Sequence, residues 1–290
     1  MRIYRSIIVL FVLVLITGCG VGSLQQKGYV APENFHTRVD FTTVKTVMII
    51  PAKTDGVSKN FLFDTGAQVS LIQRDTIIGK SSTMGGASKG KAKVGSEIIG
   101  SMRIGDLEFR NTYAGNMDFK GLKEQIPDFG GLIGQPIISK ANWLIDYPNK
   151  RMEISDSELA DATFQTLEIE RKGGSPYTFV TINEKKHRVV IDFGSSSRFN
   201  VPRGSKLADE LMQTLEFKDR QRERYTIGGL QNITEKVGVV PLIKLGNIEF
   251  KNVEMNINTS SQPRIGISFF EDCIVYIDNT NGTYKVKKVL

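Results

Sequence analysis

Short runs of apolar and β-branched residues alternate with polar turns along most of the chain. The runs are rich in Val, Ile, Phe and Thr, and clusters of Gly, Asn or Lys separate them, a pattern typical of antiparallel strands. The clearest predicted strands cover residues 47–51, 61–63, 179–182 and 188–191. Apolar residues recur at helical spacing around 135–142 and around 207–217. The pattern therefore predicts a mainly β protein with few short helices.

The second half of the chain repeats elements of the first half in the same order. The separation between matched positions runs from 128 residues, for Asp64 and Asp192, to 143 residues, for Gly85 and Gly228. It increases after Asp192, where the predicted helix at 207–217 accounts for the extra residues. Because five elements recur in one order, we interpret the chain as an internal duplication. The matched segments are 59–67 with 188–195, 84–86 with 227–229, 104–111 with 245–252, 132–134 with 264–266 and 145–146 with 277–278.

The duplication divides the chain into two similar lobes. The polar segment 155–164 lies between the copies, so we expect an N-terminal lobe at 39–157 and a C-terminal lobe at 158–290. Residues 20–35 are polar and show no periodicity. We therefore expect residues 19–38 to form a flexible tether ahead of the first lobe.

Residues 1–18 have the character of an export signal. Arg2 and Arg5 form a basic start, and an unbroken apolar run of ten residues follows at 7–16. That run is too short to span a bilayer as a helix but suits the core of a signal peptide. Its end, Thr17-Gly18-Cys19, resembles the bacterial lipobox, which implies a lipid on Cys19 and a membrane anchor. The alternative is an ordinary cleaved signal with a chance cysteine.

Gly20 follows this cysteine where many inner-membrane lipoproteins have aspartate. We therefore expect a lipoprotein of the bacterial cell envelope at the outer membrane, facing the periplasm. Loss of Arg2 and Arg5 lowers the net charge from +7 to +5. The basic excess is spread along the chain without an arginine stripe interleaved with aromatic residues, so nucleic acid is not an expected partner. A basic surface near anionic lipid is the favoured interpretation.

The composition limits the chemistry. The 290 residues are 40% hydrophobic and 24% charged, which is ordinary for a globular protein. Two cysteines exclude a disulfide scaffold and a cysteine zinc cluster, and two distant histidines disfavour a histidine triad or a histidine metal site. We expect no cofactor and no metal. With Cys19 lipidated, Cys273 lies in an apolar stretch and is expected in the core.

The duplication repeats one carboxylate in a distinctive setting. Asp64 and Asp192 each follow an apolar strand and precede an X-Gly turn, where glycine permits a close backbone approach. If the copies pack about a two-fold axis, the two carboxyl groups meet and share one proton. One group then activates water and the other donates to a peptide carbonyl. The alternative for either residue alone is a turn aspartate; Asp146 and Asp278, which also recur, are interpreted in that way.

Residues 63–67, Phe-Asp-Thr-Gly-Ala, resemble the hydrophobic-Asp-Thr-Gly-Ala/Ser motif of aspartic peptidases. Residues 132–134 resemble the hydrophobic-hydrophobic-Gly element that supports the catalytic loop of that family. Residues 84–86 lie between them, where the family has its flap hairpin. The first copy is similar to a retropepsin-like bacterial aspartyl protease domain, and residues 40–290 resemble a pepsin-like pair of such domains. The resemblance implies a two-lobed acid-protease fold of duplicated β-barrel lobes.

The resemblance also implies roles for individual residues. Asp64 and Asp192 would be the catalytic pair, and the Thr65 hydroxyl would brace the two loops across the axis. Gly66 and Gly194 would allow close approach, and Ser195 occupies a position that often hydrogen-bonds the outer oxygen of the aspartate. The supporting glycines would be Gly134 and Gly266, and the flap candidates are Gly85, Gly86, Gly228 and Gly229.

The second copy departs from the family pattern at two positions. Phe193 stands where Thr or Ser is expected, which removes half of the hydroxyl bracing. Arg264 replaces an apolar residue of the supporting element. Either change could displace the aspartates. The rate of catalysis is sensitive to small displacements of the reacting groups. The first flap lacks an aromatic residue near Met84, whereas Tyr225 lies beside the second.

These observations predict an aspartic endopeptidase that hydrolyses a peptide or protein substrate with water activated by Asp64 and Asp192. An extended substrate would lie between the lobes, covered by one or both glycine-bearing hairpins. One alternative is a catalytically inactive, protease-like module that binds peptides in the cell envelope, which Phe193 and Arg264 favour. A structural outer-membrane lipoprotein is the third possibility and depends on Cys19 alone.

Overall fold

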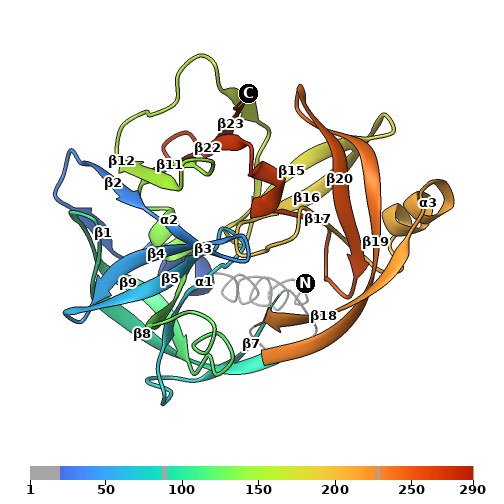
Figure 1. Cartoon of the computed structure of the whole chain (residues 1–290). Helices are drawn as coiled ribbons and strands as arrows, with labels where there is room; N and C mark the ends of the chain where they lie inside the picture. Colours follow the sequence, from blue (N-terminus) through green and yellow to red (C-terminus); the bar gives the residue numbers. More distant parts are fainter. Residues whose placement is uncertain (1–19, 87–89, 227–228, 290) are drawn as a thin grey trace, which may run out of the picture.

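The computed structural model describes residues 20–86, 90–226 and 229–289 and is mainly β (Figure 1). The predicted export signal and Cys19 lie outside these residues. The described strands form three sheets of nine, six and eight strands. The mainly β class expected from the sequence is therefore confirmed.

The nine-stranded sheet comes from the first half of the chain. Six of its strands form a closed ring in the order β4, β5, β10, β6, β9 and β8, because β8 pairs with both β9 and β4. Within the ring, β5 is parallel to β10 and β6 is parallel to β9. The strands of this sheet are β1 (Tyr29–Ala31), β3 (Thr42–Val44), β4 (Val47–Thr54), β5 (Val57–Phe63), β6 (Ser70–Gln73), β7 (Ser82–Gly85), β8 (Lys91–Ile104), β9 (Leu107–Met117) and β10 (Phe129–Ile133).

The eight-stranded sheet comes from the second half and has the same topology. Its ring runs β15, β16, β21, β17, β20 and β19, and β19 closes it by pairing with β15. The parallel pairs are β16 with β21 and β17 with β20, which correspond to those of the first ring. The strands are β14 (Glu170–Lys172), β15 (Ser175–Ile182), β16 (Lys185–Asp192), β17 (Phe199–Pro202), β18 (Lys218–Thr226), β19 (Gly229–Leu245), β20 (Ile248–Asn258) and β21 (Arg264–Gly266).

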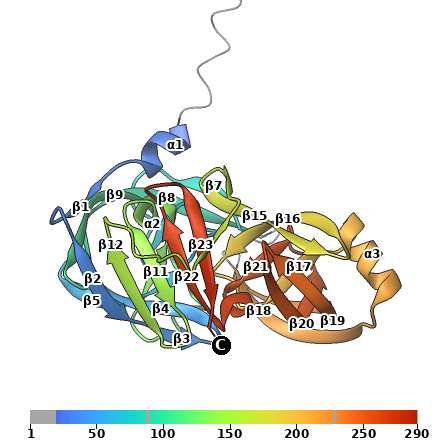
Figure 2. The ribbon, with the colours of Figure 1, turned by 90° about the horizontal axis from the view of Figure 1, so that it is seen from above.

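Both halves contribute to the six-stranded sheet, which lies between the two rings (Figure 2). Its central strands, β11 and β22, are antiparallel, and Leu144 lies opposite Tyr276. These two positions are equivalent in the repeat, since they precede the matched residues Ile145 and Ile277. An approximate two-fold axis therefore passes between β11 and β22. The strands are β2 (His36–Asp40), β11 (Asn142–Asp146), β12 (Arg151–Ser155), β13 (Gln165–Leu167), β22 (Cys273–Asp278) and β23 (Thr283–Lys288).

The helices are short, and one of them is an insertion in the second half. Helix α3 (Lys206–Thr214) confirms the helix expected at 207–217, although it ends at Thr214. The Ser205 hydroxyl caps it by accepting a hydrogen bond from the Ala208 amide at 3.2 Å. The helix expected at 135–142 is shorter than predicted, because α2 (Gln135–Ile138) ends before β11 begins. The other helices are α1 (Gly20–Gln25) and the 3₁₀ helix η1 (Ile267–Phe270).

Part of the segment expected to form a flexible tether has regular secondary structure. It contains α1 and β1, and β1 pairs with the edge of β9, with Tyr29 opposite Arg110. Residues 36–38 belong to β2. A three-residue strand is too short to give a periodic signal, and its backbone pairing with β9 supplies the order. No helix within the described residues is long and apolar enough to cross a membrane.

Trp143, on the central strand β11, lies in the middle of the core. It is fully buried and packs against Phe63, at 5.1 Å between ring centroids, and against Phe109, at 5.9 Å. Its indole Nε1–H donates to the carbonyl oxygen of Ile138 at 2.7 Å. Cys273 is also fully buried, with a free thiol, as expected. Trp143 thus ties the first ring to the shared sheet and to α2.

We predict that Trp143→Ala lowers the free energy of unfolding by about 3–5 kcal/mol, because it leaves a large cavity in a close-packed core. Trp143→Phe, which keeps a ring but loses the hydrogen bond, should cost less. Urea unfolding followed by far-UV circular dichroism measures both, since Trp143 is the only tryptophan and its fluorescence is lost. An alanine variant as stable as the parent would contradict this account of the core.

Candidate active site

Asp64 and Asp192 meet at the ends of equivalent strands. Asp64 directly follows β5, and its amide donates to the Ile133 carbonyl of β10 at 2.9 Å. Asp192 is the last residue of β16 and lies opposite Gly266 of β21. A Cβ atom added to Gly66 would lie within 3.3 Å of carboxyl atoms of both Asp192 and Asp64, so the two carboxyl groups are neighbours. The structure therefore brings together the two carboxyl groups that the repeat had singled out.

Each glycine of the two Asp-X-Gly turns makes room for the aspartate of the other turn. A Cβ atom added to Gly66 would lie 2.9 Å from Cγ of Asp192, and one added to Gly194 would overlap the carboxyl group of Asp64. Any side chain at either position would push the carboxyl groups apart. The glycines therefore permit the contact between the two aspartates.

Gly134 and Gly266 lie directly against the backbone of the two turns. A Cβ atom on Gly134 would lie 2.8 Å from the carbonyl oxygens of Ala67 and Val69. One on Gly266 would collide with the carbonyl oxygens of Ser195 and Ser197. The strands β10 and β21 can thus approach the turns closely only because these positions have no side chain.

The bracing across the axis is one-sided. The buried hydroxyl of Thr65 donates to the Ile191 carbonyl at 2.8 Å and accepts from the Phe193 amide at 3.0 Å. Phe193 has no hydroxyl to return these bonds; its ring packs against Phe270 at 5.6 Å between centroids. An apolar contact in the second half therefore takes the place of the second pair of hydrogen bonds.

The surroundings of Asp64 favour its protonated form. Burial, the charge of Asp192 and the hydrogen bond to Asp192 raise the pKa of Asp64 to about 8. The amides of Gly66 and Ala67 donate to Oδ1 of Asp64 at 2.8 and 3.1 Å and act in the opposite direction. At neutral pH the Asp64 carboxyl therefore holds a proton.

Asp192 has a cationic partner instead. Nη1 of Arg264 donates to its Oδ2 at 2.5 Å, and both side chains are buried. Arg264 is the residue that departs from the apolar pattern of the supporting element. Its guanidinium makes the contact that the resemblance had assigned to Ser195, whose hydroxyl accepts from Nδ2 of Asn200 at 3.3 Å.

The pair lies in a cleft of about 430 Å³ between the two rings. Asp64 and Asp192 both line it, and so do Met84, Gly85 and Gly86 at the end of β7. Of the other flap candidates, Gly228 lies outside the described residues, and Gly229 is exposed and does not line the cleft. The hairpin of β18 and β19 instead reaches the cleft through residues 222–226.

Tyr225 joins this second hairpin to the first half of the chain. Its ring lies so close to Gly121 that an added Cβ atom there would overlap it. Nζ of Lys45 lies 6.0 Å from the centre of the same ring. The β18–β19 hairpin therefore reaches the first half of the chain through Tyr225.

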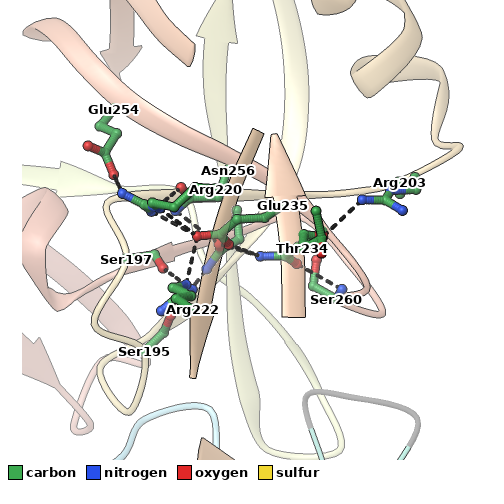
Figure 3. A network of polar contacts seen from close by, with 12 residues as sticks. Ser195, Ser197, Arg203, Arg220, Arg222, Thr234, Glu235, Glu254, Asn256 and Ser260 are labelled. Atoms are coloured by element: carbon green, nitrogen blue, oxygen red, sulfur yellow. Dashed lines mark hydrogen bonds and ion pairs between the residues drawn. The ribbon is translucent and has the colours of Figure 1, made fainter. Parts of the chain in front are cut away.

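A buried polar network holds the β18–β19 hairpin against the second ring (Figure 3). Glu235 is fully buried and accepts from Arg220 at 2.8 Å, and Nε of Arg222 lies 2.7 Å from the same oxygen. The arginines hold the pKa of Glu235 below its usual value, against the opposing effect of burial. Arg222 also donates to Oγ of Ser197 at 3.3 Å, so the network reaches the loop after Asp192.

This network and the Arg264 contact were missed by the sequence reasoning. The available signal was the strand 218–226, where Arg220, Arg222 and Arg224 occupy every second position and therefore share one face. These arginines are interleaved with polar and acidic residues, not with aromatic ones.

Asp146 and Asp278, which also recur, serve turns. Oδ1 of Asp146 accepts from the Asn149 amide at 3.2 Å, and Oδ1 of Asp278 accepts from the Asn281 amide at 2.8 Å. Their interpretation as turn residues is confirmed. Among the described residues, no three His, Cys, Asp or Glu side chains gather in a way that could hold a metal ion.

No protein-family model matches the chain, and a search among curated proteins finds no match.

We predict that Thr65→Val lowers the free energy of unfolding by about 2 kcal/mol, because both hydrogen bonds across the axis are lost while their partners stay buried. Thr65→Ser keeps the hydroxyl and should recover most of that stability. Denaturant unfolding of the two variants beside the parent gives the comparison. Equal losses in the two variants would show that the hydroxyl is not what braces the loops.

Proposed function

We propose that the chain is an aspartic endopeptidase with a two-lobed acid-protease fold. The observation that carries the proposal is the adjacent pair of carboxyl groups of Asp64 and Asp192, which lie at the ends of equivalent strands and line one cleft. Two carboxyl groups in contact cannot both ionise at low energy, so they hold one proton between them. This arrangement suits general acid–base hydrolysis of a peptide bond.

The surroundings assign different roles to the two carboxyl groups. Asp64, whose pKa is raised by burial and by Asp192, is the protonated member and donates to the carbonyl oxygen of the peptide bond. Asp192, paired with Arg264, is the carboxylate that takes a proton from water as the water oxygen attacks the carbonyl carbon. The C–N bond then breaks as that proton passes to the leaving nitrogen. Asp64 recovers its proton as the carbonyl reforms.

Arg264 would make this pair asymmetric. A buried guanidinium beside one carboxyl favours the microstate in which the proton resides on the other. The proton is then localised on Asp64 rather than shared evenly. Since the pKa of Asp64 is raised to about 8, the pair keeps its single proton through neutral pH. The proposal therefore includes activity near neutrality.

Neutral activity fits the location that we propose for the protein. The export signal and the lipobox-like Thr17-Gly18-Cys19 support a lipid on Cys19 and a position at the bacterial outer membrane, facing the periplasm. The anchor would hold the cleft near peptide or protein substrates of the envelope. The tether is shortened by the pairing of β1 with β9.

A second candidate function is peptide binding without cleavage. The ion pair between Arg264 and Asp192 favours it, because a guanidinium that occupies one carboxylate oxygen weakens the base. The replacement of a hydroxyl by Phe193 points in the same direction. In that case a peptide would bind in the cleft and remain intact.

We predict that the full chain in a non-ionic detergent cleaves a peptide library, and that the rate falls as the pH rises through about 8, because Asp64 then loses the proton that it must donate. Asp64→Asn and Asp192→Asn should each lower the rate by about a hundredfold or more. Mass spectrometry of the products between pH 4 and pH 10 measures both effects.

Asp146→Asn is the matched control, because it changes a repeated aspartate that serves a turn, and it should leave the rate near that of the parent. Binding of peptides without cleavage at any pH by a folded parent would favour the second candidate. Equal activity of Asp64→Asn and the parent would contradict the proposed mechanism.

A further inference from the structure

The second-half wall of the cleft is built around arginines. Arg222 and Arg224 of β18 and Arg264 of β21 all line it, beside the serines that follow Asp192. Arg222 and Arg224 are half-buried, whereas Arg264 is almost fully buried. Glu223 borders the cleft as well, but its side chain is exposed. This wall therefore carries three guanidinium groups.

All but one of these arginines have an acidic partner. Arg264 is paired with Asp192, and Arg222 is paired with Glu235. Arg220, which lies behind the wall, contacts both Glu235 and Glu254. Arg224 forms no hydrogen bond or ion pair within the part of the chain that the structure describes. One guanidinium in the cleft thus lacks a counter-ion.

The surroundings of Arg224 make the absence of an acidic partner energetically unfavourable. Burial lowers the pKa of Arg224, and the charges of Arg264 and Arg222 lower it further. The nearby acids Glu235 and Asp192 already accept from other arginines. A guanidinium that is partly removed from water and has no acidic partner costs free energy, which a bound anion would offset.

Two further polar atoms at this wall are buried and have no hydrogen-bond partner in the described parts of the chain. They are Nε of Arg264 and the hydroxyl of Ser260, and both residues line the cleft. Buried donors of this kind are normally hydrogen-bonded in a native structure. Together with Arg224 they leave several donors of this wall without an acceptor among the described residues.

The opposite wall has another character. It comes from the first half and is lined by apolar side chains, among them Leu62, Leu71, Phe119, Leu122, Ile126 and Leu132. Asp64 and Asp192 lie between the two walls. A peptide across the cleft would therefore meet an apolar surface on one side of the carboxyl pair and unpaired guanidinium donors on the other.

We propose that the cleft selects peptides that carry an acidic side chain on one side of the reacting bond and an apolar side chain on the other, with Arg224 as the residue that binds the carboxylate. The inference rests on the proposed function in one respect: the peptide bond between these two side chains is taken as the bond that is cleaved. The recognition itself depends only on the charge and shape of the cleft. A carboxylate binds a guanidinium through two parallel charge-assisted hydrogen bonds, which a neutral amide or a cation cannot form.

The test is binding to the full-length Asp64→Asn variant in a non-ionic detergent, so that bound peptides stay intact. The probes are fluorescent peptides blocked at both ends, with a central Leu beside Glu, Gln or Lys, in both orders. Fluorescence anisotropy at physiological salt gives the affinities. We expect the better Glu peptide to bind about tenfold more tightly than its Gln counterpart, and the Lys peptide to bind most weakly.

Replacing Arg224 by Met in the same background should remove the preference for Glu while the Gln peptide keeps its affinity. Arg103→Met is the matched control, since Arg103 is exposed and does not line the cleft, and it should keep the preference. Thermal unfolding of each variant confirms that it is folded. Rescue by Arg224→Lys should be partial, because an ammonium keeps the charge but loses the paired geometry.

The outcomes separate this inference from the proposed function. A Glu preference that depends on Arg224 supports the inference whether or not the parent cleaves peptides. Equal binding of the Glu and Gln peptides, a preference that survives Arg224→Met, or no binding at all overturns it. If the parent cleaves Gln and Glu peptides equally well, the endopeptidase proposal stands and the specificity proposal fails.

Discussion

The contact between the carboxyl groups of Asp64 and Asp192 is the constraint on which the centre of the molecule depends. Bringing two acids together inside a protein is unfavourable unless one keeps its proton. The fold must therefore hold the two groups in place. The backbone geometry of the two turns does this. Gly66 and Gly194 leave room for the opposite carboxyl group, and Gly134 and Gly266 let the supporting strands approach from below. The rings, the shared sheet and the core around Trp143 hold these turns in register across the axis.

The two halves have the same topology but differ at the site. Thr65 braces the axis from one side, and Phe193 packs into the core on the other. Arg264 contacts Asp192, whereas the equivalent residue of the first half, Leu132, is apolar and lines the cleft. These differences place positive charge on the second-half side of the carboxyl pair and apolar surface on the first-half side. A symmetric framework thus supports an asymmetric site, in which the two acids have unequal protonation and the two walls have unequal chemistry.

Sequence patterns were sufficient for the repeated elements and insufficient for the contacts between them. The short strands follow from the alternation of apolar runs and turn residues, and helix α3 and the turn roles of Asp146 and Asp278 follow from local hydrogen bonds. The partner of Asp192 could not be predicted in this way. Arg264 lies 72 residues further along the chain, and as a lone basic residue in an apolar stretch it gave no sign of what it contacts. The order of β1 was missed for a similar reason, since its pairing with a distant strand supplies the stability.

The most direct test of the account is the titration of the Asp64 carboxyl. Aspartate labelled with ¹³C at Cγ reports the protonation of each carboxyl group by NMR, and the signal absent from Asp64→Asn identifies this residue. We predict one aspartate that stays protonated at neutral pH and titrates near pH 8, and whose signal is missing in the variant. Titration of the Asp64 signal in the ordinary acidic range of aspartates would contradict the account, because the two carboxyl groups would then not hold a proton between them.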